Sequence, residues 1–452
     1  MSRRVVITGV GAISGFGLGI DALWRGLVEG RSCLKRVTRL DTSGFRSKLA
    51  AEVGADFTAK DFVPKSYRKA VKVMARDIEL AVGAARAALD DAKITTKGTL
   101  EMSGDAAGRA TYPSERMGCH IGAGLIAADA EEMAAAMATA VDEGGKFSLR
   151  KWGGEGGGGM EALTPLWLLK YLPNMLACHV TIVHGCEGPS NTITCAEASG
   201  LLSIGESSRV IQRGQGGAAD LCFSGGVESK LNVMGILRMD LAGKLAATGD
   251  ETDGSKLVRP FDEGAAGGLV GEGGGILILE EAECAARRGA KIIAEIAGFG
   301  AGHSLCGSLG EPAGAEDEGY KFAILNALDD ARMKPEQIDA IVPAAAGVKA
   351  IDNAEAWALR EVFGSRLDEV PLVTVVPNIG NCMAGQGALL AAVGARCVGE
   401  GRLPARIHAG RPRKGLDAGA SPSREAALRH VLVCTGSMGG QNAAVVLRKW
   451  GG

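Results

Sequence analysis

The stretch Gly188-Pro-Ser-Asn-Thr-Ile-Thr-Cys-Ala-Glu-Ala-Ser-Gly200 predicts a β-strand that turns directly into an α-helix. Residues 192–196 form a short β-prone run, and apolar residues recur at helical spacing through residues 198–213. Glu197 therefore stands at a tight strand-to-helix elbow. The chemistry possible at this elbow depends on that one side chain.

The elbow favours negative charge. A side chain there lies over the first turn of the helix, where unpaired amide N–H groups and the helix dipole attract an anion. A cysteine would have a lowered pKa and would act as a thiolate nucleophile. Glu197 supplies a carboxylate instead, which is a much weaker acyl acceptor. We interpret Glu197 as a structural anion, or alternatively as an acyl acceptor or general base; Cys195, two residues earlier, is a buried thiol or a second candidate acceptor.

A short internal repeat predicts two similar α/β halves. Ala88-Leu-Asp-Asp-Ala-Lys-Ile94 recurs 239 residues later as Ala327-Leu-Asp-Asp-Ala-Arg-Met333. Each copy ends an amphipathic helix that leads towards a strand, and each half has an elbow, at Glu197 and at Gly380-Asn381. We predict an N-terminal half at residues 1–257 and a C-terminal half at 258–452, with both elbow helices directed at a shared central pocket.

Composition excludes several classes of function. The 452 residues are 46% hydrophobic with a formal net charge of −2, which is typical of a globular protein and gives no footprint for nucleic acid. Eleven cysteines without paired metal spacing predict free thiols in the cytoplasm and no metal site. No run approaches the roughly 20 apolar residues of a membrane span. The glycine-rich residues 9–15 lack the register and the acidic partner of a dinucleotide fingerprint, so no cofactor is predicted.

Several motifs spread over nearly the whole chain carry a family resemblance. They are Val5-Val-Ile-Thr-Gly-Val-Gly-Ala, Gly188-Pro-Ser, Ser224-Gly-Gly-Val-Glu228, Arg259-Pro-Phe-Asp262, Gly271-Glu-Gly-Gly-Gly-Ile-Leu-Ile-Leu-Glu-Glu281, Arg288-Gly-Ala290 and Gly439-Gly-Gln-Asn442. In this order they resemble the β-ketoacyl synthases of the thiolase superfamily. The resemblance implies a five-layered αβαβα fold of two duplicated halves, a dimer, and acyl-chain elongation on an acyl carrier protein.

The resemblance also implies that the family's catalytic residue types are replaced. The matched positions are Glu197 for the cysteine, Ala344 and Asn381 for the two histidines, Val376 for the lysine, and Met438 for the phenylalanine that gates the acyl pocket. Condensation needs an acyl-accepting nucleophile and donors that polarise the malonyl carbonyl. We therefore predict no catalytic residues and no enzyme activity for the chain by itself.

The pattern is similar to that of chain length factors, which lack the cysteine and pair with a catalytic ketosynthase in polyketide and polyene pathways. The predicted function is that of a heterodimer subunit that shapes the acyl tunnel in fatty acid, polyketide or polyene biosynthesis. Two alternatives stay open. One is an acyltransferase or condensing-type enzyme with non-standard chemistry at Glu197 or Cys195, and the other is a structural homodimer that binds acyl chains or carrier protein.

Two segments bear on these partners. The alanine-rich residues 127–140 predict a helix, which the resemblance places near the dimer interface and the far end of the tunnel. Met133 and Met137, one turn apart, are candidates for the stop that sets chain length. A basic cluster of Lys65, Arg68, Lys69 and Lys72 is either a solvated surface or, through Lys69 and Lys72, a contact for the acidic carrier protein.

Overall fold

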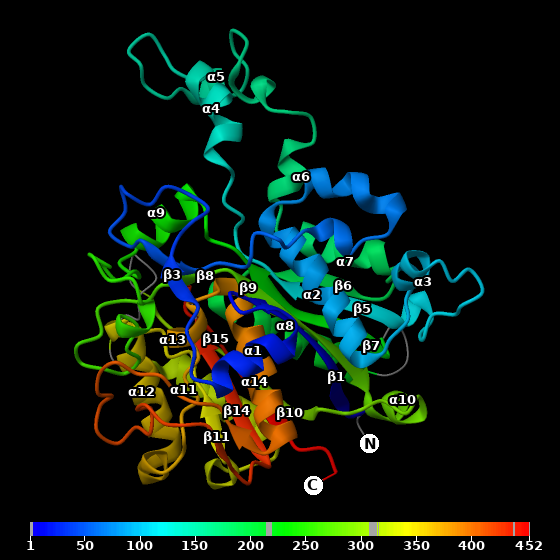
Figure 1. Cartoon of the computed structure of the whole chain (residues 1–452), viewed down its shortest axis with the longest axis vertical. Helices are drawn as coiled ribbons and strands as arrows, with labels where there is room; N and C mark the ends of the chain where they lie inside the picture. The colour runs from blue at the N-terminus through cyan, green and yellow to red at the C-terminus, as the bar shows by residue number, and fades with distance from the viewer. Residues whose placement is uncertain (1–2, 214–218, 307–313, 315, 437–438, 452) are drawn as a thin grey trace.

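Both halves of the chain contribute to one ten-stranded sheet in the computed structural model, which describes residues 3–213, 219–306, 314, 316–436 and 439–451 (Figure 1). The strand order is β11-β14-β15-β10-β1-β9-β7-β5-β6, and the short β2 pairs with β1. The strands are β1 (Val5–Ser14), β2 (Gly17–Leu18), β5 (Met117–Gly122), β6 (Ser190–Ile193), β7 (Leu221–Glu228), β9 (Gly273–Glu281), β10 (Ala294–His303), β11 (Ala340–Val342), β14 (His430–Gly436) and β15 (Gln441–Arg448).

The sheet joins two copies of one arrangement, because β1 pairs antiparallel with β10 at its centre. Next to these strands, β9 and β7 in the first half correspond to β15 and β14 in the second. The predicted duplicated α/β fold is thereby confirmed. Since β9 pairs with β1 and β7, the first half's share of the sheet extends to Glu281. The predicted boundary between residues 257 and 258 stays a prediction.

Three hydrophobic clusters explain the five layers. The central cluster lies around α8 (Ser199–Gln212) and α14 (Gln386–Glu400), which are covered by strands of both halves. One outer cluster packs α2 (Arg76–Ala92) and α7 (Met175–His184) on the strands of the first half. The other packs α11 (Glu318–Asp330) and α12 (Lys349–Phe363) on those of the second half. The five layers are therefore outer helices, the strands of the first half, the central helices, the strands of the second half and outer helices, as expected.

The internal repeat holds corresponding helices against corresponding strands. In the first half, Asp91 Oδ2 accepts a hydrogen bond from the Val10 amide at 2.8 Å; in the second, Asp330 Oδ2 accepts one from Phe299 at 2.9 Å. Glycines allow the close approach, because a Cβ at Gly11 would overlap the Ala84 carbonyl oxygen and a Cβ at Gly300 that of Ala323. The glycines near the N-terminus thus serve helix-on-strand packing.

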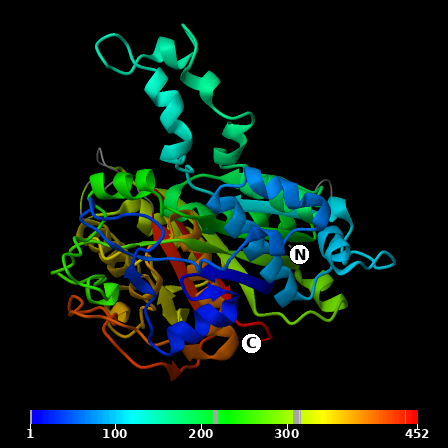
Figure 2. The same ribbon diagram turned by 45° about the horizontal axis from the view of Figure 1, so that its top comes forward.

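An arm formed by residues 125–172 projects from the sheet (Figures 1 and 2). It holds α4 (Ala130–Thr139), α5 (Leu149–Trp152), η4 (Gly159–Ala162) and α6 (Trp167–Tyr171). Its two limbs are joined at the base, where Glu132 pairs with Lys170 and accepts a hydrogen bond from Tyr171 Oη at 2.6 Å. Many large apolar side chains of the arm are exposed: Leu125, Met137, Val141, Phe147, Leu149, Met160, Leu166 and Leu168.

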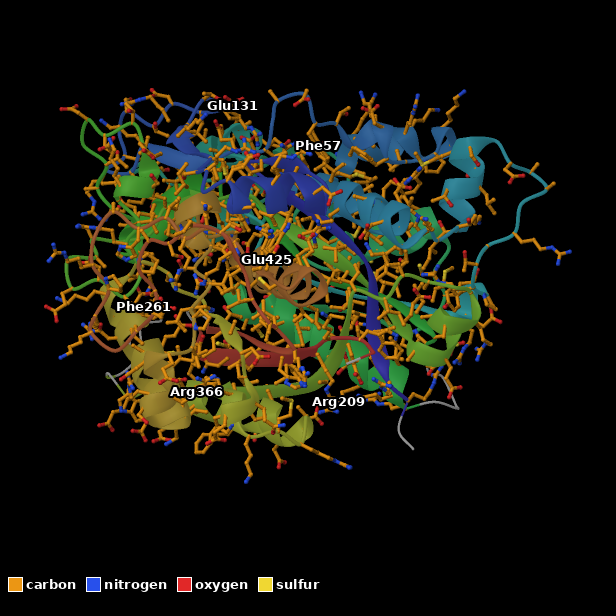
Figure 3. All side chains as sticks on the ribbon, turned by 60° about the horizontal axis from the view of Figure 1, so that its bottom comes forward. Phe57, Glu131, Arg209, Phe261, Arg366 and Glu425 are labelled. Atoms are coloured by element: carbon orange, nitrogen blue, oxygen red, sulfur yellow. The ribbon has the colours of Figure 1, made fainter. Side chains whose placement is uncertain are left out.

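The remaining elements are short and lie around the sheet. They are α1 (Ile20–Val28), β3 (Leu34–Arg36), β4 (Leu49–Ala51), η1 (Ala59–Asp61), η2 (Lys65–Val73), α3 (Lys97–Ser103), η3 (Ser114–Arg116), α9 (Val233–Leu241), η6 (Gly254–Lys256), β8 (Val270–Gly271), α10 (Ala282–Arg287), η7 (Pro335–Gln337), η8 (Gly364–Asp368), β12 (Arg402–Leu403) and β13 (Arg424–Glu425). Side chains of both charges cover the face in Figure 3, where Arg366 and Glu425 are labelled. Among the described residues, no helix has the length and apolar character needed to cross a membrane.

Candidate active-site cavity

The elbow at Glu197 is built by a short 3-10 turn, η5 (Ala196–Ala198), between β6 and α8. The strand ends at Ile193, three residues earlier than the sequence suggests, because Ala196 takes a left-handed conformation with φ 43°. Ser199 holds the turn, since its Oγ accepts a hydrogen bond from the Cys195 amide at 2.8 Å and donates one to the Ala196 carbonyl at 2.7 Å. Glu197 is 7% exposed.

The second elbow has the same construction. It runs from α13 (Val376–Ile379) through η9 (Met383–Gly385) into α14, and Met383 has a φ of 49°. Gln386 takes the place that Ser199 has in the first half, because its Oε1 accepts a hydrogen bond from the Cys382 amide at 3.0 Å. The elbows meet where Asn381 Nδ2 donates to Glu197 Oε1 at 3.3 Å.

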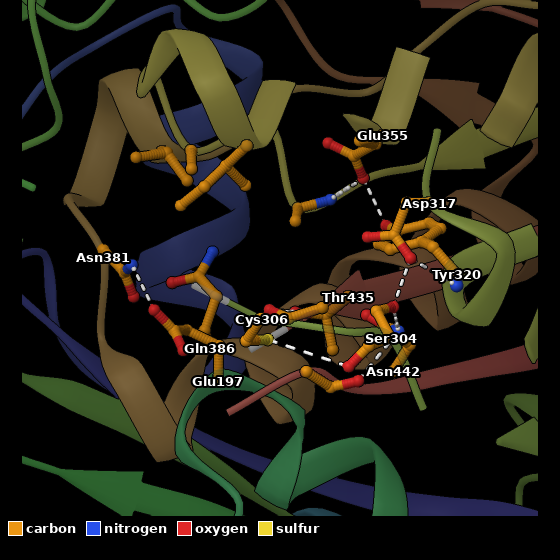
Figure 4. A pocket seen from close by; sticks show the side chains of 16 residues that line it. Glu197, Ser304, Cys306, Asp317, Tyr320, Glu355, Asn381, Gln386, Thr435 and Asn442 are labelled. Carbon is orange, nitrogen blue, oxygen red and sulfur yellow. Dashed lines mark hydrogen bonds between the residues drawn. The ribbon is translucent and has the colours of Figure 1, made fainter. Parts of the chain in front are cut away.

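A small cavity of about 40 Å³ opens between the elbows (Figure 4). It is lined by Glu197, Ser304, Cys306, Asp317, Tyr320, Ala344, Ala346, Ile351, Glu355, Val376, Asn381, Gln386, Thr435, Gly436, Gly440 and Asn442. The fold therefore brings together four of the positions predicted from the family pattern: Glu197, Ala344, Val376 and Asn381. Met438 lies outside the described residues.

Buried acids form the wall opposite the elbows. Glu355, on α12, accepts hydrogen bonds from the amides of Ala344 and Ala345, both at 2.8 Å, and from the hydroxyl of Tyr320. Burial raises the pKa of Glu355 to about 7 and raises the pKa of Tyr320 well above its ordinary value. Tyr320 and Glu355 thus lock the loop that carries Ala344, the predicted position of a family histidine.

Asp317 completes this wall. Its carboxylate accepts hydrogen bonds from Ser304 Oγ and from the Tyr320 amide, the latter at 2.9 Å. Asn442 Nδ2 donates to Ser304 Oγ at 2.6 Å, so Asn442, which closes one of the family motifs, is held by Ser304. The Asn442 amide group is therefore part of the wall opposite the elbows.

Sequence reasoning missed most of the far wall. Asp317 caps the N-terminus of α11, and Tyr320 and Glu355 lie on α11 and α12; no motif singled them out. Gln386 could have been found, because it lies four residues after Cys382, as Ser199 lies four residues after Cys195. Only the structure shows that its amide reaches the cavity.

The other candidates lie elsewhere. Cys195 is half-buried against the central core and does not line the cavity, and burial raises the pKa of its thiol. Lys69 and Lys72 are exposed on η2. Met133 is half-buried and Met137 exposed on α4, within the projecting arm. Their roles in carrier contact and chain length stay predictions.

The lining residues have a distinct chemical character. No lysine, arginine or histidine is among the described residues that line this cavity. Lys244 lines a smaller adjoining cavity together with Glu197. Within the described part of the chain, no three histidine, cysteine, aspartate or glutamate residues form a group suited to a metal ion. The cavity offers amide and hydroxyl donors to a carbonyl group, together with carboxylate oxygens.

Comparisons with known proteins give consistent matches. The family model of the β-ketoacyl synthase N-terminal domain matches residues 2–285, and that of the C-terminal domain matches residues 293–410. The chain is 28% identical to 3-oxoacyl-[acyl-carrier-protein] synthase 2 of Staphylococcus aureus (strain COL), over 99% of both chains. It is also 28% identical to the enzyme of that name from Coxiella burnetii (strain RSA 493 / Nine Mile phase I), again over 99% of both.

A solved structure matches over the full length. The ishigamide ketosynthase/chain length factor superposes with a TM-score of 0.79 and 29% identity, covering 100% of both chains. The thiolase-like fold expected from the motifs is therefore confirmed.

One expectation is overturned by these relatives. The sequence predicts that the chain is not an enzyme by itself, whereas the matched 3-oxoacyl-[acyl-carrier-protein] synthases are catalytic enzymes aligned over almost the entire chain. The prediction is wrong because it rested only on the residues that the resemblance implies are replaced, and it gave no weight to a scaffold shared over almost the whole chain with the matched synthases.

Proposed function

Because the chain belongs to the β-ketoacyl synthase family, we propose that it works in a β-ketoacyl-acyl-carrier-protein synthase as the chain-length-factor-type subunit of a heterodimer. The observation that carries the proposal is Glu197, which lies at the elbow inside the cavity, at the position matched to the family's cysteine. In this proposal a cysteine-bearing ketosynthase subunit accepts the acyl group and the present chain shapes the tunnel.

The likeness to the ishigamide ketosynthase/chain length factor supports this assignment, since it extends over the full length of both chains. Ala344 and Asn381 support it further, because neither side chain can take up and return a proton as the histidines matched to these positions can. The products we propose are acyl chains of the fatty acid, polyketide or polyene type.

The projecting arm is the proposed contact with the ketosynthase subunit. Its exposed apolar side chains, which include Phe147, Leu149 and Leu168, would be costly to leave in water over such an area. In the pair, α4 would lie against the partner, and Met133 and Met137 would close the far end of the tunnel. Lys69 and Lys72 on η2 are the proposed contact for the acidic carrier protein.

A second candidate follows from the catalytic relatives. Glu197 itself could accept an acyl group as a mixed anhydride, or act as a general base, within the same cavity. Cys195 is the weaker candidate, because it does not line the cavity. A third candidate is a homodimer that only binds acyl chains or carrier protein. It would be distinguished from the proposed heterodimer because the chain would pair with itself.

The cytoplasm remains the proposed compartment, since all eleven cysteines are unpaired thiols.

Co-expression with a cysteine-bearing ketosynthase from the same genome tests the proposal. Native mass spectrometry should show a one-to-one pair, and the pair should make 3-ketoacyl products from acyl and malonyl carrier-protein thioesters. Met133→Trp and Met137→Trp should shorten those products, whereas Met160→Trp, elsewhere on the arm, should leave their length unchanged. A stable homodimer that ignores the ketosynthase, or unchanged product lengths, would contradict the assignment.

A further inference from the structure

We infer that Lys230 is the positioning residue of the projecting arm, and that together with Glu228 it fixes the root of the arm to the second elbow. Lys230 Nζ donates a hydrogen bond to the carbonyl oxygen of Leu125, the first residue of the arm, at 2.9 Å. The inference rests on the proposed function only where subunit pairing and product length are measured, because the arm is the proposed contact with the ketosynthase.

The link is built by buried side chains at the end of β7. Glu228 is 1% exposed and Lys230 is 6% exposed, and the two side chains form a salt bridge. Glu228 Oε2 also accepts a hydrogen bond from the amide of Ala384, in η9 of the second elbow, at 2.8 Å. A continuous series of contacts therefore runs from the second elbow through Glu228 and Lys230 to Leu125.

The backbone on either side of this salt bridge is also held in place. A Cβ atom at Gly124, immediately before the arm, would lie 1.9 Å from Glu228 Oε1, and that carboxylate cannot move aside without losing its partners. The Ser229 amide donates to Asp77 Oδ1 at 3.2 Å, and the Ser229 hydroxyl donates to Glu272 Oε2 at 2.9 Å. These bonds anchor the link to α2 and to the start of β9.

Close packing does not fix the root of the arm. A cavity of about 440 Å³ lies at the root, between the arm and α2. Its arm side is lined by Ile126, Ala127, Asp129, Lys170 and Tyr171. Helix α4 packs mainly on α5 and η4, which belong to the arm itself. The position of the first limb relative to the sheet therefore depends on a few directed contacts, and the bond from Lys230 is one of them.

A buried salt bridge is better suited to fixing a geometry than to adding stability. Removing two charges from water costs about as much free energy as their attraction returns, so apolar side chains of similar size often stabilise such a site equally well. An apolar pair cannot donate a hydrogen bond to one particular carbonyl oxygen. We therefore expect that this pair can be replaced without loss of stability, but with loss of the position of the arm.

Hydrogen–deuterium exchange of the full chain tests the link without a partner subunit. The test variant combines Lys230→Met with Glu228→Gln, which keeps an oxygen for the Ala384 amide. The amide of Asp129, which donates to the Tyr171 hydroxyl at 3.2 Å, should exchange at least fivefold faster than in the wild type. Amides in the first turn of α4 should show the same change. The thermal unfolding midpoint should stay within a few degrees of the wild-type value.

Two single variants complete the design. Lys230→Met alone should also speed exchange at the root, but it should unfold at a lower temperature, because Glu228 then lies buried without its cation. Lys256→Met serves as the control, since it breaks an exposed salt bridge with Glu251 on η6. The control should change exchange in the arm by less than twofold.

Co-expression with the ketosynthase measures the consequence for function. The double variant should pair at least tenfold more weakly than the wild type. The pairs that form should release a broader distribution of product lengths, because Met133 and Met137 would no longer be held in one position. A merely structural defect would lower the amount of product without changing that distribution.

Unchanged exchange at Asp129 and α4 in the double variant would overturn the inference, whether or not the chain pairs with a ketosynthase. A large fall in the unfolding midpoint of the double variant would also overturn it, because the salt bridge would then act by stabilising the fold. Faster exchange at the root, in a chain whose wild type never pairs, would support the link and refute the heterodimer alone.

Discussion

The two elbows of the molecule share a backbone geometry and differ in the side chains that they carry. Ala196 and Met383 both adopt positive φ, and Ser199 and Gln386 each hold the amide of a preceding cysteine. After these turns the first elbow carries Glu197, whereas the second carries Ala384, whose amide donates to Glu228 at 2.8 Å. The comparison teaches that a duplicated scaffold is held by backbone geometry, and that chemistry is assigned by single side chains placed on it.

The largest loss of stability is expected from substitutions that disrupt the packing of helices on the sheet. Gly11→Val and Gly300→Val each place a side chain against a helix carbonyl, so each should cost about 3 kcal/mol or more of unfolding free energy. Chemical denaturation measures the loss, and Gly44→Val, at an open exposed position, serves as the control. A loss in one half only would contradict equivalent packing in the two halves.

The next prediction concerns condensation activity, and it distinguishes the role of the elbow residue from the roles of the residues around it. Glu197→Cys alone should give no measurable condensation, because Ala344 and Asn381 leave the second half-reaction without donors. Adding Ala344→His and Asn381→His should raise turnover at least about 100-fold above that single variant. Mass spectrometry of 3-ketoacyl carrier-protein products provides the measurement. Robust turnover by the single variant would show that the histidine positions are misassigned.

A buried acid in each half gives a pH-dependent effect. Burial raises the pKa of Asp77 on α2 to about 7 and that of Asp352 on α12 to about 8. The folded state therefore holds a proton that the unfolded chain has released, so stability falls as pH rises from about 4 to about 8, by up to about 1.4 kcal/mol per pH unit for each group.

Asp352→Asn tests this expectation in the second half, because the amide keeps an oxygen for the Phe261 N–H and cannot ionise. The decline in unfolding free energy between pH 5 and pH 8 should become shallower in this variant. Asp77→Asn should also give a shallower decline, and the flattening should be confined to pH values below about 7, because the Asp77 contribution ends near its own raised pKa. Parallel curves for wild type and both variants would contradict the assignment of these acids.

The smallest effect compares the two copies of the repeat. Asp91→Ala and Asp330→Ala should each cost about 1 kcal/mol, since each removes one acceptor from a strand amide. Asp330→Ala should cost slightly more, because Asp330 also pairs with Arg209 at 3.0 Å. Asp90→Ala, at an exposed pair with Arg86, should change stability by less than about 0.5 kcal/mol. Urea denaturation measures these changes. A loss of stability in only one of Asp91→Ala and Asp330→Ala would contradict the equivalence of the two copies of the repeat.

The sequence predicted the scaffold well because its signals are local and repeated. The repeat at residues 88–94 and 327–333 indicates the two halves, and the helical spacing after Glu197 indicates the elbow. The positions of Ala344, Val376 and Asn381 followed from motif order, and the cavity includes all three.

The rest of the site depends on long-range contacts that no local pattern reports. Tyr320 and Glu355 meet across 35 residues of chain, and Ser304 meets Asn442 across 138. The Gln386 Nε2 group has no hydrogen-bond partner among the described residues, and its place in the site is apparent only once the cavity is defined. The prediction of no enzyme activity was wrong for a related reason, because replaced side chains were counted without the catalytic relatives that share the whole scaffold.

The central claim is that the ketosynthase partner accepts the acyl chain while Glu197 shapes the site beside it. The most direct test is to incubate the co-expressed pair with an acyl carrier-protein thioester and to map the acyl group by peptide mass spectrometry. The account predicts an adduct on the partner's elbow cysteine. An adduct on Glu197 of the present chain would contradict it and would assign acyl transfer to this elbow instead.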